Sequence, residues 1–133
     1  MKISRPLGEL EMEVMKTLWA RGSATGKEIW EDIRTSRKTA LTTVLTVVDR
    51  LWRKKMISKT KEESLLVFGP LISKDEYTKE MSGRIFSDYL SISSSSLIAS
   101  FVNTLEKVGP EELDKLSDYI NKKKKEKRYQ GLS

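Results

Sequence analysis

The side chains of this sequence best suited to a chemical role are the hydroxyls and cations of one segment, TALTTVLTVVDRLWRKK, at positions 39–55. Four threonines stand among its aliphatic residues, and arginines and lysines follow them. Threonine is only a middling helix former, because branching at Cβ restricts χ1 against the preceding turn. A helix that served only as core would rarely use so many. Hydroxyls followed by cations are suited to hydrogen bonds and ion pairs with an anionic partner.

Catalytic chemistry has little support in this composition. The chain has no cysteine and no histidine, which excludes disulfides, thiolate and imidazole metal sites, and histidine-activated nucleophiles. Three pairs of adjacent acids lie in an expected turn or in expected first turns of helices, where capping and the helix dipole explain them. These pairs are Glu62/Glu63, Asp75/Glu76 and Glu111/Glu112. We therefore expect no enzyme, no cofactor and no metal site.

The net charge of +6 is unevenly distributed. Residues 1–71 hold 14 Lys/Arg and 9 Asp/Glu, residues 72–120 hold 5 and 9, and residues 121–133 hold 6 and 1. Within residues 34–61, nine cations stand with a single acid, Asp49. This density favours a polyanionic partner, nucleic acid first, with a solvated basic face as the alternative.

Nothing in the sequence indicates a membrane or export segment. No apolar run approaches the roughly 18 residues that cross a bilayer. The first residues, MKISRPLGELE, lack the apolar core of a signal peptide. We expect a soluble, cytoplasmic protein, whose length fits one ordinary domain or a small domain with an extension.

Three helices are expected at the start of the chain. Residues 7–19 repeat apolar side chains at three- and four-residue steps, and Gly22 ends the pattern. Thr25 followed by Glu28 has the spacing of a capping box, which predicts a second helix. A third helix follows, for which Thr39 is the expected cap.

Two short strands, at residues 57–61 and 65–69, follow the helices and are joined by a polar turn at 62–64. This order is that of a winged helix-turn-helix, and a three-helix bundle with a hairpin lid is the alternative. We therefore expect a mainly α fold with a small β-hairpin, in which residues 1–71 form a winged-helix DNA-binding domain.

Residues 72–133 are expected to form a helical dimerisation region with a basic tail. Helical spacing covers residues 73–90, 96–108 and 110–128, and the serine run 91–96 is the expected joint. Helices with such narrow apolar faces do not readily bury themselves alone, which favours packing against a second copy. The residues expected at the dimer interface are Ile85, Tyr89, Leu97, Phe101, Leu105, Leu113, Leu116 and Ile120.

On a helical wheel the third helix has an aliphatic side and a hydroxyl side. The aliphatic side comprises Ala40, Val44, Val47, Val48 and Leu51. The hydroxyl side suits a major groove, where short side chains reach phosphates or base edges, and tolerated solvent-facing threonines are the alternative. Leu41 and Leu45 flank it and could touch thymine methyls or pack under the hairpin. Cations expected near phosphates are Lys54, Lys55, Lys59 and Lys61.

Two further features have open interpretations. Trp19, Trp30 and Trp52 stand at or beside apolar stripes, so core packing is favoured over stacking on bases. The tail NKKKKEKR (121–128) is either solvated or an additional contact for DNA or an anionic membrane surface.

Three segments carry a resemblance to a known family: LGELEMEVMKTLW (7–19), TTVLTVVDRLWRKKMI (42–57) and FVNTLEKVGPEELDKL (101–116). They closely resemble the penicillinase repressor family, the transcriptional repressors of the β-lactamase, methicillin-resistance and copper-homeostasis type. The resemblance implies a homodimer that binds a dyad-symmetric operator, with each third helix in the major groove, and blocks transcription. A winged-helix protein-interaction module with an incidental basic face is the alternative.

Carried over position by position, the resemblance places Thr42, Thr43 and Thr46 on the groove-reading positions of the family. It also matches basic positions near phosphates at Arg50, Lys59 and Lys61. The full set of expected DNA contacts is Thr25, Lys38, Thr39, Thr42, Thr43, Thr46, Arg50, Arg53, Lys59 and Lys61.

The sequence departs from the family pattern at three points. Leu45 stands where some members have an arginine, which implies a different base pair in the operator. In β-lactam-sensing members a protease cuts near an Asn-Phe pair, where this chain reads Ser100–Phe101; a regulatory protease is thus a candidate partner, but this bond departs from the pattern. Copper-sensing members end in a cysteine cluster, and without cysteine this chain lacks copper–thiolate sensing.

Overall fold

The structure, a computed structural model, describes residues 6–132; residues 1–5, which entered the signal-peptide argument, lie outside the described residues. The chain divides into two compact units, Met1–Gly83 and Arg84–Ser133. The boundary falls inside α4 (Lys74–Leu90).

The first unit reaches past residue 71 because the start of α4 packs within it. Tyr77 and Met81 are both buried. The Tyr77 ring lies 5.7 Å from the Trp19 ring, and its hydroxyl accepts a hydrogen bond from the Leu7 N–H at 3.3 Å. The first turns of α4 therefore belong to the core of the first unit.

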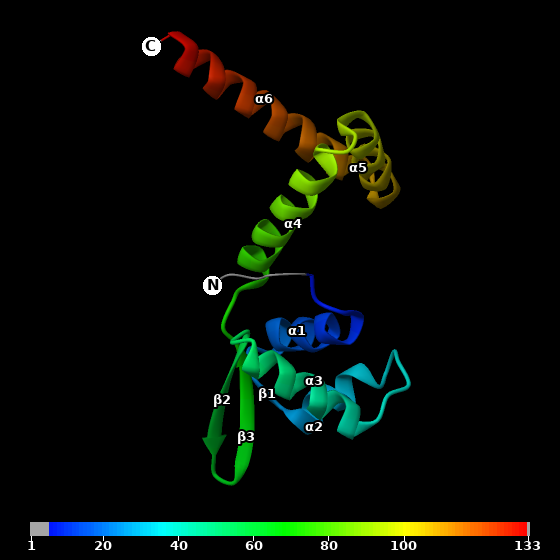
Figure 1. Cartoon of the computed structure of the whole chain (residues 1–133), viewed down its shortest axis with the longest axis vertical. Helices are drawn as coiled ribbons and strands as arrows, with labels where there is room; N and C mark the ends of the chain where they lie inside the picture. Colours follow the sequence, from blue (N-terminus) through cyan, green and yellow to red (C-terminus); the bar gives the residue numbers. More distant parts are fainter. Residues whose placement is uncertain (1–5, 133) are drawn as a thin grey trace. The chain divides into compact units, whose positions relative to one another are not determined.

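Three helices and a three-stranded sheet build the first unit (Figure 1). Its helices are α1 (Glu9–Arg21), α2 (Gly26–Ile33) and α3 (Leu41–Arg53). Its strands are β1 (Ala24–Thr25), β2 (Ile57–Glu62) and β3 (Leu65–Pro70). The strands are antiparallel in the order β1-β3-β2, which with the helices gives the expected winged helix-turn-helix.

The ends of the helices follow from local chemistry, with one correction. Gly22 closes α1 with φ 84°, a left-handed conformation that suits glycine. Thr25 and Glu28 form the expected capping box at the start of α2. The expected cap of α3 is wrong, because its N-cap is Ala40, which provides no side-chain hydrogen bond. Thr39 instead accepts a hydrogen bond at its carbonyl from the Trp30 indole N–H at 2.9 Å.

The aliphatic side of α3 enters the core as the wheel predicts. Val44, Val47, Val48 and Leu51 are all buried, whereas Ala40, expected among them, is exposed at the cap. The helix contacts α1, α2 and β2. The core also contains buried residues of the other two helices and of the sheet: Val14, Met15, Leu18, Ile29, Ile33, Ile57 and Phe68.

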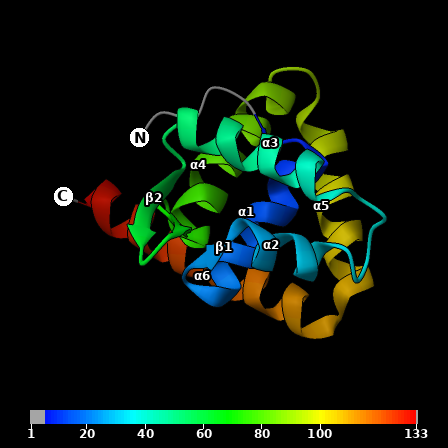
Figure 2. The ribbon, with the colours of Figure 1, turned by 90° about the horizontal axis from the view of Figure 1, so that it is seen from below.

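The hairpin of β2 and β3, called the wing below, differs from its prediction in two ways. Glu62 pairs with Leu65, so the turn is shortened to residues 63–64. A third strand, β1, pairs with Val67 and Phe68 of β3 and was not expected. In Figures 1 and 2 the loop between α2 and α3 (residues 34–40) lies at the opposite end of the helices from the wing.

The tryptophans do not share one environment. Trp19 and Trp30 are half-buried, and the Trp19 indole N–H donates to the Ile72 carbonyl at 2.8 Å. Trp52 is 41% exposed, so the expectation of core packing is wrong for this residue.

The second unit continues α4 and adds α5 (Ser94–Val108) and α6 (Pro110–Leu132). The joint between α4 and α5 is shorter than the serine run, because the Ser93 hydroxyl caps α5 by accepting from the Ser96 N–H. None of the described side chains of α5 and α6 is fully buried. Among the described residues, no helix is long and apolar enough to cross a membrane.

Candidate nucleic-acid interface

One side of α3 is exposed and bears short hydroxyl side chains. Thr42, Thr43 and Thr46 are all exposed, opposite the buried valines of the same helix. The Thr46 hydroxyl donates to the Thr42 carbonyl at 2.9 Å, which occupies its proton within the helix. Thr46 therefore presents a methyl group and oxygen lone pairs outward, and acts toward a ligand as an acceptor and an apolar contact.

Arginines continue this exposed side toward the end of α3. Asp49 and Arg53 form an ion pair at 3.0 Å across one helical turn, which directs the guanidinium along the helix surface. Arg50 is exposed beside them. We call the exposed set Thr42, Thr43, Thr46, Asp49, Arg50 and Arg53 the hydroxyl side of α3.

Cations flank the hydroxyl side at both of its ends. Lys38 is exposed on the loop before α3, and Lys59 and Lys61 are exposed on β2 of the wing. Since the loop and the wing lie at opposite ends of the helices (Figure 2), positive charge brackets α3 along its length. This arrangement suits a long polyanion that runs past the helix.

The two lysines of the wing, Lys59 and Lys61, project from the face of the hairpin that meets the core. Lys59 pairs with Phe68, which is buried, and residues two apart on a strand share a face, so Lys59 and Lys61 lie on the side that meets the core. The Lys59 ammonium lies 3.5 Å from the centroid of the Trp52 ring. Glu62 and Glu63 are exposed at the tip, directly after Lys61, and place negative charge there.

Several cations of the 34–61 block are bound by the chain itself, which the sequence did not reveal. The Lys54 ammonium lies 2.7 Å from a carboxylate oxygen of Glu11, so its charge is already paired within the first unit. Arg37 pairs with Glu9 at 3.0 Å. The Arg34 guanidinium stacks on Trp30 at 4.7 Å. Within the described part of the chain, four cations of the block have no hydrogen bond, ion pair or cation–π contact through their side chains: Lys38, Arg50, Lys55 and Lys61.

Glu11 is the buried acid of the first unit, at 8% exposure. Burial by itself raises the pKa of Glu11, but hydrogen bonds from the Lys54 ammonium and the Gly8 N–H, with the positive charges of Lys54 and Arg50, outweigh it and leave the pKa below its usual value. The carboxylate therefore stays ionised and ties α1 to the end of α3.

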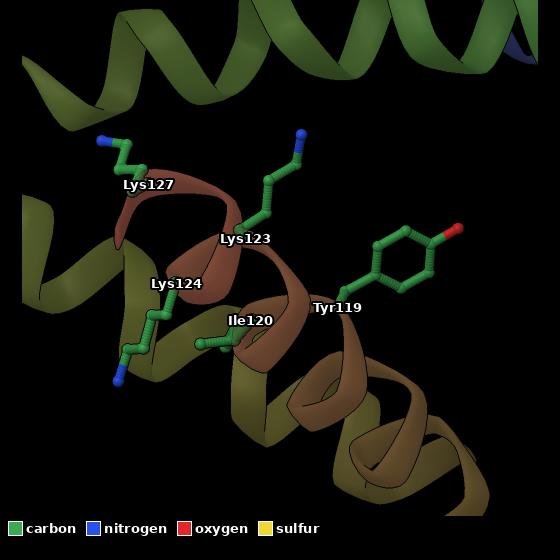
Figure 3. A pocket seen from close by; sticks show the side chains of 5 residues that line it. All are labelled: Tyr119, Ile120, Lys123, Lys124 and Lys127. Carbon is green, nitrogen blue, oxygen red and sulfur yellow. The ribbon is translucent and has the colours of Figure 1, made fainter. Parts of the chain in front are cut away.

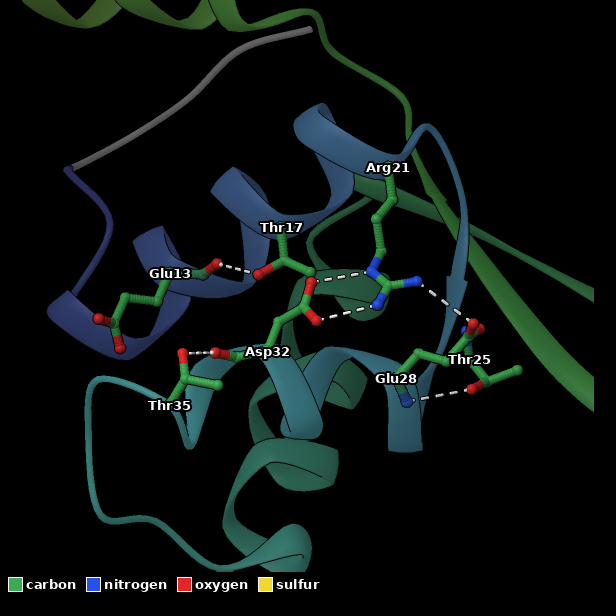
Figure 4. Close-up of polar contacts among 7 residues, drawn as sticks. All are labelled: Glu13, Thr17, Arg21, Thr25, Glu28, Asp32 and Thr35. Carbon is green, nitrogen blue, oxygen red and sulfur yellow. Dashed lines mark hydrogen bonds and ion pairs between the residues drawn. The ribbon is translucent and has the colours of Figure 1, made fainter.

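A polar network holds α2 against α1 (Figure 4). The Arg21 guanidinium binds both carboxylate oxygens of Asp32, at 2.8 and 2.9 Å, and this hydrogen bonding lowers the pKa of Asp32. Thr25, expected at the interface, is half-buried; its hydroxyl accepts from the Glu28 N–H at 3.2 Å, and its own N–H donates to the Glu28 carboxylate at 2.8 Å. These two groups of Thr25 therefore serve the cap of α2.

A tight contact sets the distance between α2 and α3. A Cβ added at Gly26 would collide with Cδ2 of Leu45, a side chain that is 41% exposed. Leu45 therefore leans onto α2 at the border of the hydroxyl side. The sequence left the role of Leu45 open, and the glycine opposite it was the one signal that could have resolved it.

The second unit displays apolar side chains in place of a buried core. Phe86 and Phe101 meet edge to face at 5.4 Å. They line an apolar groove of about 200 Å³ together with Leu90, Leu97 and Ile98. Of the residues expected at a dimer interface, Tyr89, Phe101 and Ile120 are exposed, and the others are half-buried: Ile85, Leu97, Leu105, Leu113 and Leu116.

No group of three acidic side chains that could hold a metal ion occurs in the described part of the chain. The candidate site consists of exposed hydroxyl and cationic side chains on α3, the loop before it and the wing.

Known proteins resemble the chain over most of its length. The model of the penicillinase repressor family matches residues 7–122. The transcriptional regulator BlaI of Mycobacterium tuberculosis is 32% identical over 118 residues, which are 86% of this chain and 82% of that protein. The methicillin resistance regulatory protein MecI of Mammaliicoccus sciuri is 25% identical over 117 residues, 88% of this chain and 94% of that protein.

Solved structures agree with the fold of the first unit. The monomeric form of Bacillus licheniformis BlaI in complex with the blaP half-operator matches with a TM-score of 0.50 and 27% identity, covering 58% of this chain and 94% of that chain. The DNA-binding domain of the repressor BlaI matches with the same values. These relatives are repressors and not enzymes, which agrees with the expected class of protein. With its winged helix in place and the family model matched from Leu7 to Lys122, the chain is a member of the penicillinase repressor family.

Proposed function

We propose that this protein is a homodimeric transcriptional repressor that binds double-stranded operator DNA, with α3 of each protomer in the major groove of one half of a dyad-symmetric site. The observation that carries the proposal is the hydroxyl side of α3, exposed and bracketed by Lys38 on one flank and by the wing lysines on the other. Its short side chains allow the helix backbone to approach the bases closely. A groove-bound helix needs this combination of a dry anchoring side and a polar reading side.

The residues of the surface divide into two roles. Thr42, Thr43 and Thr46 read base edges, and the outward methyl and lone pairs of Thr46 suit a thymine methyl or an amino donor of a base. Thr39 lies at the start of α3, where a backbone phosphate passes. The cations bind phosphates and hold the register: Lys38, Arg50, Arg53, Lys59 and Lys61.

Support for a DNA partner comes from a relative. The BlaI structure with a half-operator contains a monomeric repressor on half of a site, and its fold corresponds to the first unit of this chain. Two such units joined by symmetry would bind two half-sites, which is the usual logic of a palindromic operator.

The second unit supplies the surface for dimerisation. None of the described side chains of α5 and α6 is fully buried, and within one chain the apolar groove with Phe101 stays uncovered. A second copy is the occupant that also provides the two-fold symmetry of the operator. Burial of these side chains against a partner would stabilise the dimer through the hydrophobic effect.

The decisive experiment compares two substitutions in the full chain on duplexes selected from a random library. Thr46→Ala should lower discrimination between selected and random DNA, whereas Lys59→Ala should weaken both about equally. Thr78→Ala is a matched control, because the Thr78 hydroxyl makes the same helical bond, to the Lys74 carbonyl at 2.7 Å. Equal loss of discrimination from Thr46→Ala and Lys59→Ala would contradict the assigned roles.

Dependence on salt separates this proposal from the winged-helix protein-interaction module. Binding to DNA through several phosphates should weaken with a log–log slope near about −0.9 for each contact. Sedimentation at micromolar concentration should give a dimer. A monomer in that measurement would contradict the role given to the second unit.

Removal of the repressor by a regulatory protease has a structural requirement. The bond between Ser100 and Phe101 lies in the middle of α5, and Phe101 packs on Phe86. Since proteases prefer exposed loops, a cut here requires α5 to open locally.

A further inference from the structure

The end of α6 is a basic helix that the proposed function does not use. Residues 122–128 contain six cations and one acid, Glu126. The match to the family model ends at residue 122, so five of these cations lie beyond the segment that the family model describes. We call residues 121–132 the basic extension.

The cations of the basic extension surround the helix. Every described side chain beyond Ile120 is exposed. Figure 3 shows Lys123 and Lys124 projecting to different sides of α6. A shallow groove of about 330 Å³ lies where the apolar stripe of α6 gives way to lysines, and it is lined by Tyr119, Ile120, Lys123, Lys124 and Lys127.

This charge distribution favours an anionic occupant. Lys123 and Lys127, like Lys124 and Arg128, stand one turn apart, and like charges at this spacing repel. Lys123 and Glu126 form an ion pair at 3.7 Å, which offsets little of the repulsion. A polyanion alongside the helix would neutralise the charges and stabilise the helical conformation.

The linear charge density of the basic extension is comparable to that of duplex DNA. At about 1.5 Å per residue, the six cations of 122–128 occur about once per 1.7 Å of helix, which is close to the axial charge spacing of B-DNA. A membrane surface fits less well, because an interfacial helix needs an apolar face, and the apolar stripe of α6 ends at Ile120. A helix with positive charges on all sides is suited to bind the phosphate backbone of DNA without contacting the bases.

We propose that the basic extension is a second DNA-binding surface, which binds the phosphate backbone without sequence preference and adds to the affinity provided by α3. The inference rests on the proposed function, since the DNA bound by α3 supplies the phosphates. The extension raises affinity for all DNA, while discrimination between sequences stays with the hydroxyl side of α3.

The test uses the full chain with Lys122, Lys123, Lys124 and Lys125 changed to Gln, called the tail variant. Glutamine has about the same helix propensity as lysine, so the helix should be kept. The matched control changes four other exposed lysines to Gln: Lys16, Lys74, Lys79 and Lys107. Binding to a random-sequence duplex of about 40 base pairs is followed by fluorescence anisotropy as NaCl is varied. The tail variant should lose at least about tenfold in affinity at about 0.1 M NaCl. The slope of the logarithm of its affinity against the logarithm of the NaCl concentration should be less negative by about 2 to 4. The control should change the slope by less than about one contact, and circular dichroism should show equal helicity for both variants.

Four results would overturn the inference. The first is an unchanged slope in the tail variant, and the second is an equal loss in the control. The third is sedimentation of the tail variant as a monomer, which would show that the basic extension contacts a second copy of the chain instead of DNA. Binding of the full chain to phosphatidylserine vesicles that the tail variant loses, with DNA binding unaltered, would also overturn it in favour of lipid. Absence of DNA binding by the unaltered chain would instead contradict the proposed function itself.

Discussion

The ammonium of Lys59 lies 3.5 Å from the centroid of the Trp52 ring, so a cation of the wing rests on an aromatic side chain of α3. Trp52 is 41% exposed and is therefore held at the surface instead of in the core. The contact joins the two elements that the proposed function places on DNA. Through it, the indole restricts where the charge of Lys59 can stand.

Replacement of Trp52 by Leu should weaken DNA binding although Trp52 itself need not touch DNA. A cation–π contact at an exposed site contributes about 0.5–1 kcal/mol, so the affinity should fall about two- to fivefold. The measurement is a double-mutant cycle of Trp52→Leu with Lys59→Gln, read by anisotropy on one duplex. The two losses should be less than additive, because each removes the same positioned charge. Strictly additive losses would show that the two residues act separately.

Much of this fold could be predicted from local patterns. The three- and four-residue spacing of Val44, Val48 and Leu51 is a property of one helix, and the capping box of Thr25 and Glu28 spans a single turn. Both are confirmed because the interactions they predict occur between neighbours in sequence. The hydroxyl side of α3 followed from the same periodicity.

Features that depend on distant residues could not be predicted. Lys54 and Glu11 are 43 positions apart, so nothing near Lys54 indicates that its charge is already paired. The strand β1 has two residues, too few to show an alternating pattern, and forms because β3 offers a free edge. The contact of Trp52 with Lys59 likewise joins a helix to a strand, so the helical spacing around Trp52 does not indicate it.

Replacement of Lys55 is expected to change the stability of the fold and the affinity for DNA in opposite directions. Its φ of 63° is left-handed, and the hydrogen bonds of its N–H to Trp52 and of the Met56 N–H to Leu51, both 3.0 Å, form a Schellman motif in which glycine is the usual residue. Lys55→Gly should therefore raise the free energy of unfolding by about 1 kcal/mol in a denaturant titration.

The same substitution should weaken DNA binding severalfold if the exposed Lys55 ammonium binds a phosphate. Lys55→Gln is the matched control, since it removes the charge but keeps the strained backbone. It should lose the same affinity without any gain in stability. A gain in stability from Lys55→Gln would disprove the role of the backbone conformation.

The ion pair of Glu11 with Lys54 predicts sensitivity of the fold to acid. Because the pKa of Glu11 is lower in the folded chain than in the unfolded chain, its contribution is complete above the usual glutamate range and is lost as the pH falls through the folded pKa. Glu11→Gln should cost about 1–2 kcal/mol near neutral pH and less in acid. Urea titrations at neutral pH and at acid pH measure the loss of unfolding free energy under each condition, with the exposed Glu80→Gln as control. A cost of Glu11→Gln that is equal at both pH values would refute the assignment.

The contact between Gly26 and Leu45 predicts a substitution that alters binding more than stability. A Cβ at Gly26 meets only the end of the Leu45 side chain, which is exposed enough to rotate away, so Gly26→Ala should cost less than about 1 kcal/mol in unfolding free energy. The displaced leucine would then project beside Thr42 and Thr46, where the proposal places DNA. Affinity for selected duplexes should fall, and the double variant Gly26→Ala with Leu45→Ala should recover part of it, because the projecting side chain is gone. If the double variant binds no better than Gly26→Ala alone, the loss arises from α2 itself and Leu45 is not the steric cause.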